Sequence, residues 1–156
     1  IVNMFAGIGI FSIVIARKVS PVKVYSIDIN PYAYRYMVEN VRINKVENYV
    51  IPLLGDAAEV IVEKLISVAD RVLMPLPELA ISYLKYAVLS LRSKGFLHTY
   101  LFVKANNRKE SLKKAEEMYS QELVKYVRNY RLLSYRVVRS VGPRKYQVVL
   151  DYYVEK

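Results

Sequence analysis

The chain lacks several residues on which common kinds of site depend. Its 156 residues include no cysteine, no tryptophan and a single histidine, His98. Without cysteine it has no disulfide framework, no thiolate zinc site and no cysteine nucleophile. One histidine makes no imidazole cluster, so we expect no metal site. No apolar run approaches the length of a membrane span and no signal peptide is visible, so we expect a cytoplasmic protein without membrane attachment.

Acidic residues are fewer than basic residues. There are 24 Lys and Arg residues against 14 Asp and Glu residues, which gives a formal net charge of +10. Hydrophobic residues make up 54% of the chain, a composition typical of a globular domain with a sizeable core. So much positive charge on one domain favours an anionic partner such as nucleic acid.

Strand patterns alternate with helix patterns along the chain. We expect strands at residues 1–5, 22–29, 49–54, 70–74, 96–104, 131–140 and 145–154. We expect helices at residues 8–19, from Asn30-Pro31 onward, and at 57–68, 78–92 and 108–128. The alternation implies βαβ units in an α/β fold with a mostly parallel sheet. The last two strands are joined by Gly142-Pro143 with no helix between them, which predicts a C-terminal antiparallel hairpin.

Three groups of residues follow predicted strands, where open parallel sheets bind ligands. The small residues of the turn Phe5-Ala6-Gly7-Ile8-Gly9 let a backbone approach a ligand, although a plain helix entry would use them too. Asp28 comes about 20 residues later, where an acid accepts ribose hydroxyls, and Asn30 is available to cap the next helix. Asp56 suits either the amino group of an adenine or a helix cap. A third glycine is missing near Ser12, which favours S-adenosylmethionine over a dinucleotide.

The seven strands and five helices resemble the Rossmann-like fold of class I S-adenosylmethionine-dependent methyltransferases. A narrower resemblance rests on a set of short motifs, namely the glycine turn, Asp28-Ile29-Asn30-Pro31, Asp56-Ala57, Met74-Pro75-Leu76-Pro77, Gly95 with His98, and Gly142-Pro143-Arg144. Together they resemble the catalytic domain of the archaeal and eukaryotic tRNA (guanine-N1)-methyltransferases that act at position 37. This family is related to the tRNA transferases of the wyosine pathway.

The resemblance implies methyl transfer from S-adenosylmethionine to N1 of guanine 37 in tRNA, by a domain that we expect to be monomeric. It implies a cofactor-binding role for nine residues: Phe5, Ala6, Gly7, Gly9, Asp28, Ile29, Asp56, Ala57 and Pro75. Two positions depart from the family. Asn3 stands where Asp is common, and Pro75 replaces an Asn whose amide lies between the cofactor and the target base.

The general base is the residue that we do not expect within this chain. Guanine N1 carries a proton at neutral pH, so its attack on a sulfonium methyl group requires a base. The resemblance places that base, a glutamate, before Ile1. Glu39, Glu47 and Glu59 fall on predicted helices or loops and are expected at the surface. We therefore interpret residues 1–156 as a catalytic domain without its N-terminal RNA-recognition part, and expect little methyl transfer from it alone.

The C-terminal third is the most basic part of the chain. Residues 101–156 hold 13 basic and 6 acidic residues, a charge of +7, whereas residues 1–100 carry +3. We predict that Arg136, Arg139, Arg144 and Lys145 contact tRNA phosphates. The alternative is an ordinary hairpin with its arginines turned to solvent.

Other functions stay open at this point. A wyosine-pathway enzyme would methylate a tricyclic guanine derivative, which the loss of the usual Asn at Pro75 makes plausible, or transfer an aminocarboxypropyl group. The aminocarboxypropyl transferases commonly have Glu at the position of Asp28, so the chain fits them less well. A non-catalytic RNA-binding module is a further alternative. We expect His98 to be a packed residue rather than a catalyst.

Overall fold

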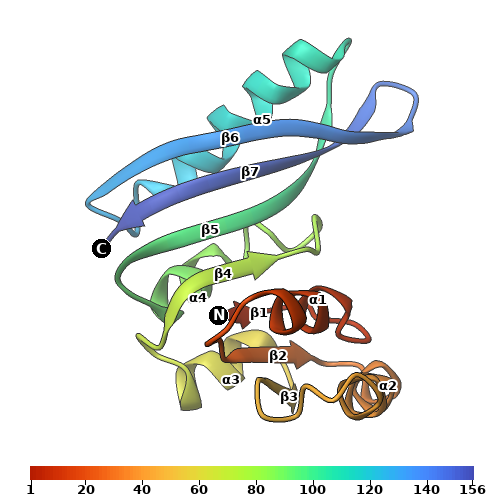
Figure 1. Cartoon of the computed structure of the whole chain (residues 1–156). Helices are drawn as coiled ribbons and strands as arrows, with labels where there is room; N and C mark the ends of the chain where they lie inside the picture. Colours follow the sequence, from red (N-terminus) through yellow and green to blue (C-terminus); the bar gives the residue numbers. More distant parts are fainter.

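A computed structural model describes residues 1–156, and Figure 1 shows one twisted sheet with helices on both faces. Its strands are β1 (Val2–Asn3), β2 (Val24–Asp28), β3 (Val50–Leu54), β4 (Ala69–Met74), β5 (Leu91–Lys104), β6 (Asn129–Gly142) and β7 (Lys145–Glu155). Its helices are α1 (Ile10–Lys18), α2 (Pro31–Ile43), α3 (Ala57–Lys64), α4 (Leu84–Ser90) and α5 (Arg108–Leu123). None of these helices is long and apolar enough to cross a membrane.

The strand order fixes where a ligand can bind. The sheet runs β3-β2-β1-β4-β5-β7-β6, and β1 to β5 pair in parallel. β7 runs antiparallel between β5 and β6, so the predicted antiparallel hairpin and the predicted α/β class are both confirmed. From β1 the chain builds outward first through β2 and β3 and then through β4 and β5. The order therefore reverses between β1 and β4, the point at which open sheets of this kind bind ligands.

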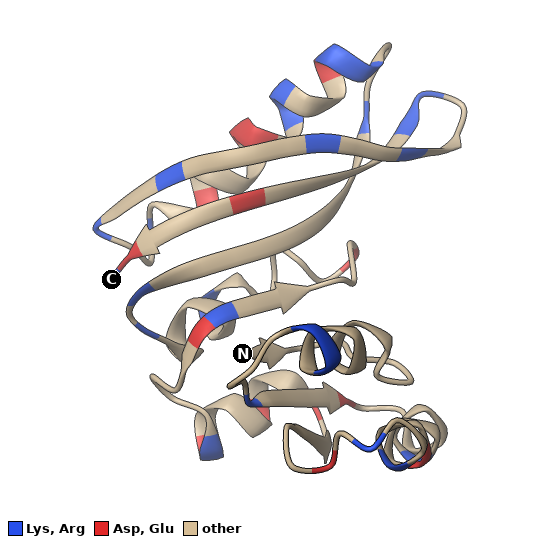
Figure 2. Cartoon of the chain, in the orientation of Figure 1, with Lys and Arg blue, Asp and Glu red and all other residues tan.

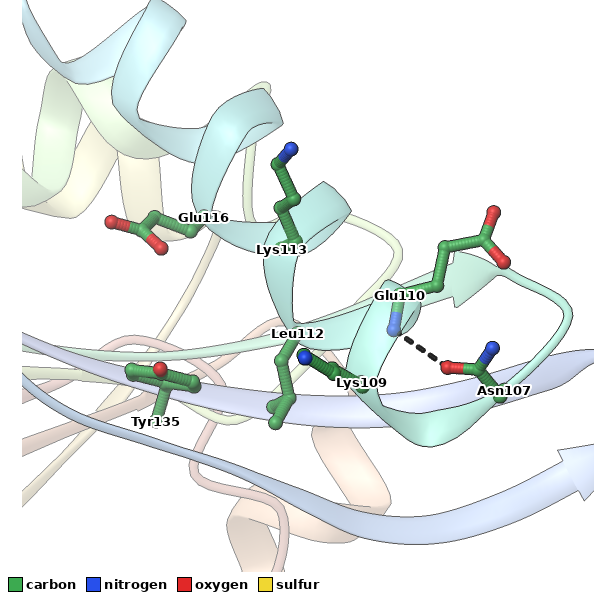
Figure 3. A pocket seen from close by; sticks show the side chains of 7 residues that line it. All are labelled: Asn107, Lys109, Glu110, Leu112, Lys113, Glu116 and Tyr135. Atoms are coloured by element: carbon green, nitrogen blue, oxygen red, sulfur yellow. Dashed lines mark hydrogen bonds between the residues drawn. The ribbon is translucent and has the colours of Figure 1, made fainter.

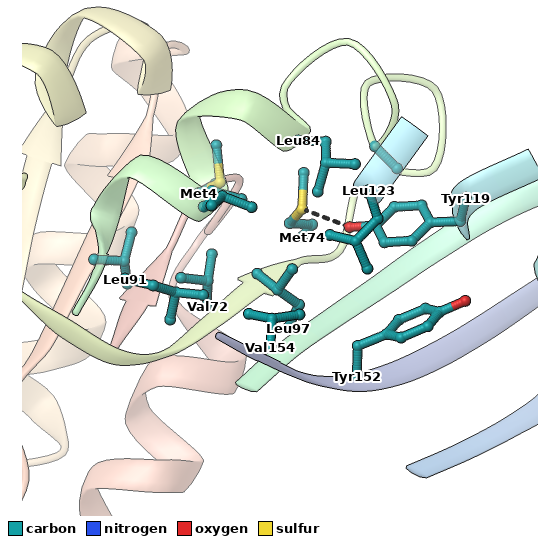
Figure 4. Packing of buried hydrophobic residues seen from close by; sticks show 14 of the residues in the cluster. Met4, Val72, Met74, Leu84, Leu91, Leu97, Tyr119, Leu123, Tyr152 and Val154 are labelled. Carbon is teal, nitrogen blue, oxygen red and sulfur yellow. Dashed lines mark hydrogen bonds between the residues drawn. The ribbon is translucent and has the colours of Figure 1, made fainter. Parts of the chain in front are cut away.

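Two apolar clusters hold the helices to the sheet. The larger contains 25 buried residues and joins β4, β5 and β7 to α3, α4 and α5 (Figure 4). Within it the Tyr119 and Tyr152 rings stack with centroids 5.5 Å apart, and the Tyr119 hydroxyl lies 3.5 Å from the Met74 sulfur. The smaller cluster packs α1 and α2 against β2 and β3, around Met37 and Val41. On that second face the part of the sheet formed by β5, β7 and β6 has no helix over it (Figure 1).

The helix expected over 57–68 ends at Lys64, and the strand expected over 1–5 is reduced to Val2–Asn3. Three further boundaries differ more from the structure. The helix expected over 78–92 is confined to α4, because the chain before it closes separate turns, including a bond from the Leu79 N–H to the Leu76 carbonyl. β5 begins directly after α4, because Leu91 pairs with Ala69 across an irregularity in β4. The helix expected over 108–128 ends at Leu123, and the Arg128 N–H then donates to the Glu155 carbonyl at the end of β7.

The close approach of β4 and β5 requires glycine at position 95. A Cβ there would lie 2.7 Å from the Asp70 carbonyl oxygen and 2.7 Å from a Leu91 methyl carbon. At Gly142, in the β6–β7 hairpin, a Cβ would have no atom within 4 Å.

We predict that Gly95→Ala lowers the free energy of unfolding by about 1–3 kcal/mol, since the backbone of β4 must shift to admit the methyl group. Gly142→Ala is the matched control and should change it by less than about 0.5 kcal/mol. Urea unfolding of both variants measures the difference. Equal stability of the two variants would contradict the close contact between the strands.

Candidate cofactor site at the strand ends

A cavity of about 170 Å³ lies at the carboxyl ends of β1, β2 and β3. Five of the nine predicted cofactor-binding residues line it: Phe5, Asp28, Ile29, Asp56 and Ala57. The remaining wall is apolar and comes mainly from the chain between β4 and α4, at Leu76, Leu79 and Tyr83. Residues more than 50 positions apart in the sequence therefore line one cavity, which has both acidic and apolar walls.

Asp28 ties the end of β2 to the glycine turn after β1. Its Oδ2 accepts a hydrogen bond from the Gly7 N–H at 2.7 Å, and its Oδ1 accepts one from the Asn30 N–H at 2.9 Å. A carboxylate has about four acceptor positions, so each oxygen can accept a further donor from a ligand. The predicted cap also forms, because the Asn30 side chain accepts from the Tyr32 N–H at 2.9 Å. Asn30, and not Asp28, is therefore the side chain that caps α2.

The turn needs its glycines for conformation. Gly7 has φ of +56° and Gly9 has φ of +88°, a region that other residues adopt only with strain. At Gly9 a Cβ would also lie 2.9 Å from the Met37 Cγ of α2. Ala6, Gly7 and Gly9 therefore shape the turn beside the cavity. They are not among the residues that line it.

Asp56 serves as the cap of α3 and also faces the cavity. Its Oδ1 accepts from the Ala58 N–H at 2.7 Å, and its Oδ2 accepts from the Tyr83 hydroxyl at 2.6 Å. The hydrogen bond to this carboxylate, aided by burial, raises the pKa of Tyr83 to about 12. Asp56 therefore caps α3, which was one of its two predicted roles. The same side chain lines the cavity, so a ligand there could also reach it. Sequence reasoning missed Tyr83, because one tyrosine among 15 inside a predicted helix carries no distinguishing signal.

Pro75 lies apart from this cavity. It lines a neighbouring one of about 260 Å³, together with Phe11 and Ile15 of α1 and with residues of β5, β6 and β7 that include His98, Arg136 and Asp151. The next residue, Leu76, lines the first cavity. The segment after β4 therefore contributes to both cavities: Leu76 lines the first and Pro75 lines the second.

His98 belongs to a row of polar side chains across four adjacent strands. Its Nδ1 lies 2.6 Å from Asp151 Oδ1, its other ring nitrogen contacts Arg71, and the Ser134 hydroxyl donates to Asp151 Oδ2 at 2.9 Å. Burial lowers the pKa of His98 in spite of the neighbouring carboxylate, which favours the neutral imidazole. His98 and Asp151 of this row line the second cavity.

The four predicted RNA-binding residues all lie on the β6–β7 hairpin (Figure 2). Arg136 reaches the second cavity, and Arg144 is exposed in the turn between the strands. The other two have partners within the chain: the Arg139 Nε donates to Gln147 Oε1 at 2.8 Å, and the Lys145 ammonium lies 4.6 Å from the centre of the Phe102 ring. The hairpin forms the edge of the sheet opposite to β3.

The largest cavity, of about 580 Å³, lies elsewhere, between α5 and β6 (Figure 3). Its lining is mostly charged side chains of α5, and its Asn107 is occupied as the cap of that helix through the Glu110 N–H at 2.9 Å. It contains no strand end and none of the predicted cofactor-binding residues. We therefore place the site in the smaller cavity. No group of three or more Asp, Glu or His side chains is arranged to hold a metal ion.

The sheet order and the strand-end cavity define a class I methyltransferase fold, as predicted. Within that class the chain belongs to the TRM5/TYW2 methyltransferase domain family, whose family model matches residues 1–127. The family is S-adenosylmethionine-dependent, so the predicted cofactor and the predicted resemblance are confirmed.

Two curated relatives illustrate the range of the family. The chain is 43% identical over 151 residues to the tRNA 4-demethylwyosine(37)-methyltransferase Taw21 of Saccharolobus solfataricus, which covers 97% of this chain and 53% of that protein. It is 37% identical over 153 residues to the tRNA (guanine(37)-N(1))-methyltransferase Trm5b of Pyrococcus abyssi, which covers 97% of this chain and 43% of that protein. The chain thus spans about half the length of these relatives.

Solved structures agree with this assignment. Methanocaldococcus jannaschii TYW2 in complex with AdoMet superposes with a TM-score of 0.81 at 34% identity, over 99% of this chain and 68% of that one. The complex of aTrm5 and tRNALeu gives a TM-score of 0.80 at 31% identity, over 99% of this chain and 40% of that one.

Proposed function

We propose that the chain binds S-adenosylmethionine in the strand-end cavity and methylates N1 of guanine 37 in tRNA. The observation that carries the proposal is the pairing of Asp28 and Asp56 in one cavity, at the ends of neighbouring strands. A ribose with two hydroxyls and a base with an amino group present donors that match two carboxylates. The names of the curated relatives, which act at position 37 of tRNA, support the substrate.

The residues present fit this cofactor. Asp28 would accept the ribose hydroxyls while it holds the glycine turn, and Asp56 would accept the amino group of the adenine. Ile29 is 66% exposed at the cavity and, with Leu76 on the lining, offers apolar surface to the flat base. When bound, S-adenosylmethionine supplies an activated methyl group on a sulfonium, so the protein needs no nucleophile of its own. The chain's part is to hold the two substrates in line.

No glutamate lines either cavity, so the chain offers none there as the base for guanine N1. Glu39, Glu47 and Glu59 are exposed and line neither the 170 Å³ nor the 260 Å³ cavity. Asp151 does line the second cavity, where it is held in the polar row by its pairing with His98 and by the Ser134 hydroxyl that donates to it. We therefore propose that the base comes from outside residues 1–156, and that this domain is one part of the working enzyme.

A second candidate function is methylation of a tricyclic guanine derivative at the same position. Pro75 favours it, because proline has no side-chain amide and no N–H to hold the polar edge of a plain guanine. The similarity to Taw21, whose name gives 4-demethylwyosine as substrate, points the same way. Both candidates use the same cofactor site and the same tRNA position.

The basic hairpin is the surface that we propose for the tRNA backbone. Arg136, Arg139 and Arg144 are exposed along one hairpin, whose two strands contain only Asp151 and Glu155 as acids (Figure 2). Arginine forks bind phosphate with two parallel hydrogen bonds, and such contacts position a nucleic acid without reading its sequence.

We predict that Asp28→Ala weakens S-adenosylmethionine binding by about 1–3 kcal/mol, since it removes hydrogen bonds to a charged acceptor. The control is Asp70→Ala, which removes an exposed carboxylate paired with Arg92 at the opposite end of the sheet. Isothermal titration calorimetry of both variants measures the affinities. An affinity unchanged by Asp28→Ala would remove this residue from the cofactor site.

We predict that the double variant Arg139→Ala, Arg144→Ala weakens tRNA binding and lowers the slope of log K against log salt by about 1–2, since each lost phosphate contact releases about one counterion less. The control is Arg35→Ala, Arg42→Ala, which removes the same charge from exposed positions on α2. Filter binding over a salt series measures both slopes. Equal slopes for the two double variants would place the tRNA elsewhere.

The substrate is decided by presenting tRNA with guanine or with 4-demethylwyosine at position 37 to the full-length protein, which would include the proposed base, and to its Pro75→Asn variant. If guanine N1 is the target, mass spectrometry of digested tRNA finds 1-methylguanine with similar rates for both proteins. If the tricyclic base is a substrate, we expect Pro75→Asn to shift the preference toward guanine. Methyl transfer to neither tRNA would reject both functions.

A further inference from the structure

We propose that Tyr83 is a positioning residue, which holds the Asp56 carboxylate so that the cavity selects a purine with an amino group over one with an oxo group. The inference rests on the proposed cofactor site and adds a residue and a specificity to it. Its basis is that Asp56 is fixed at both oxygens, by a backbone N–H on one side and by the Tyr83 hydroxyl on the other.

Tyr83 is placed for this contact by the irregular segment before α4. The segment between β4 and α4 closes turns instead of a helix, with a bond from the Tyr83 N–H to the Leu79 carbonyl, and it carries the ring to the cavity. There the ring packs edge-on against Phe5, with centroids 5.3 Å apart and planes at 71°. Phe5 follows β1, so the ring position is determined by an element distant in sequence. The hydroxyl has Asp56 as its only hydrogen-bond partner in the chain.

The consequence for Asp56 is a fixed orientation and a fixed chemical character. A free carboxylate can turn about its last side-chain bond, and two short hydrogen bonds of 2.7 and 2.6 Å prevent that rotation. Tyr83 keeps its proton throughout the neutral range, because its pKa is raised to about 12. Asp56 therefore remains an acceptor with one free position on each oxygen.

An acceptor held in this way discriminates between two purines of nearly equal shape. The 6-amino group of adenine donates a hydrogen bond to it, whereas the 6-oxo group of hypoxanthine turns lone pairs toward the carboxylate. A site built for a donor rejects an analogue that lacks it, because the free lone pairs of the carboxylate then face the lone pairs of the oxo group instead of an N–H. Loss of the Tyr83 hydroxyl frees the carboxylate to turn toward other donors, so the discrimination should fall even where the cavity keeps its shape.

The test is Tyr83→Phe, which keeps the ring and its packing on Phe5. Tyr86→Phe is the matched control, because that ring lies 5.9 Å from Tyr83 and its hydroxyl makes no hydrogen bond in the chain. Calorimetry measures the affinities of wild type and both variants for S-adenosylhomocysteine and for S-inosylhomocysteine, its 6-oxo counterpart. We expect wild type and Tyr86→Phe to prefer the adenine compound equally, and Tyr83→Phe to lose about tenfold of that preference, the effect of one hydrogen bond to a charged group.

The ratio of the two affinities separates positioning from a structural contribution. If Tyr83→Phe weakens both compounds equally, or weakens neither, the inference is wrong while the cofactor site stands. If wild type binds neither compound, the proposed function fails and this inference fails with it. Near-ultraviolet circular dichroism of the variant confirms that the aromatic packing is retained.

Discussion

The hydrogen bond between the Asp28 carboxylate and the Gly7 N–H, at 2.7 Å, connects the parts on which the site depends. β1 is only two residues long, so few ladder hydrogen bonds determine the direction in which the chain leaves it. The Asp28 carboxylate supplies that constraint from the end of β2, and the positive φ angles of Gly7 and Gly9 allow the chain to turn into α1. A group at the centre of a proposed ligand site is therefore also the group that shapes its frame.

Asp56, which ends the loop after β3, likewise both shapes the fold and faces the proposed site. A carboxylate that caps a helix is fixed by the backbone, and one that also accepts from Tyr83 is fixed a second time. Preorganised acceptors cost a ligand less on binding, because no side chain must be ordered when it arrives. Both acids gain their orientation from hydrogen bonds within the chain, so the proposed cofactor site is built from groups that also hold the fold together.

The remaining part of the sheet has a different character. β5, β7 and β6 are long and carry His98, Asp151 and Ser134, which continue the polar row that begins at Arg71 of β4. Its charged groups neutralise one another across the strands, which lowers the cost of burying them in part. The hairpin that extends this edge leaves Arg136, Arg139 and Arg144 exposed, where the proposed tRNA backbone could reach them.

The local sequence pattern was enough to predict much of the secondary structure and the class of fold. The alternation of apolar segments predicted seven strands and the class of fold, Asn30 next to Pro31 predicted the start of α2, and Gly142-Pro143 predicted the hairpin, because each depends on neighbours along the chain. The two acids could be placed at strand ends for the same reason. The late start of α4 and the early end of α5 could not be predicted, since the hydrogen-bonded turns before α4 and the bond from the Arg128 N–H to the Glu155 carbonyl overrule helix propensity. Only the tertiary structure could bring Tyr83 to Asp56, His98 to Asp151 and Pro75 into the second cavity, because those contacts depend on how strands and turns far apart in sequence are brought together.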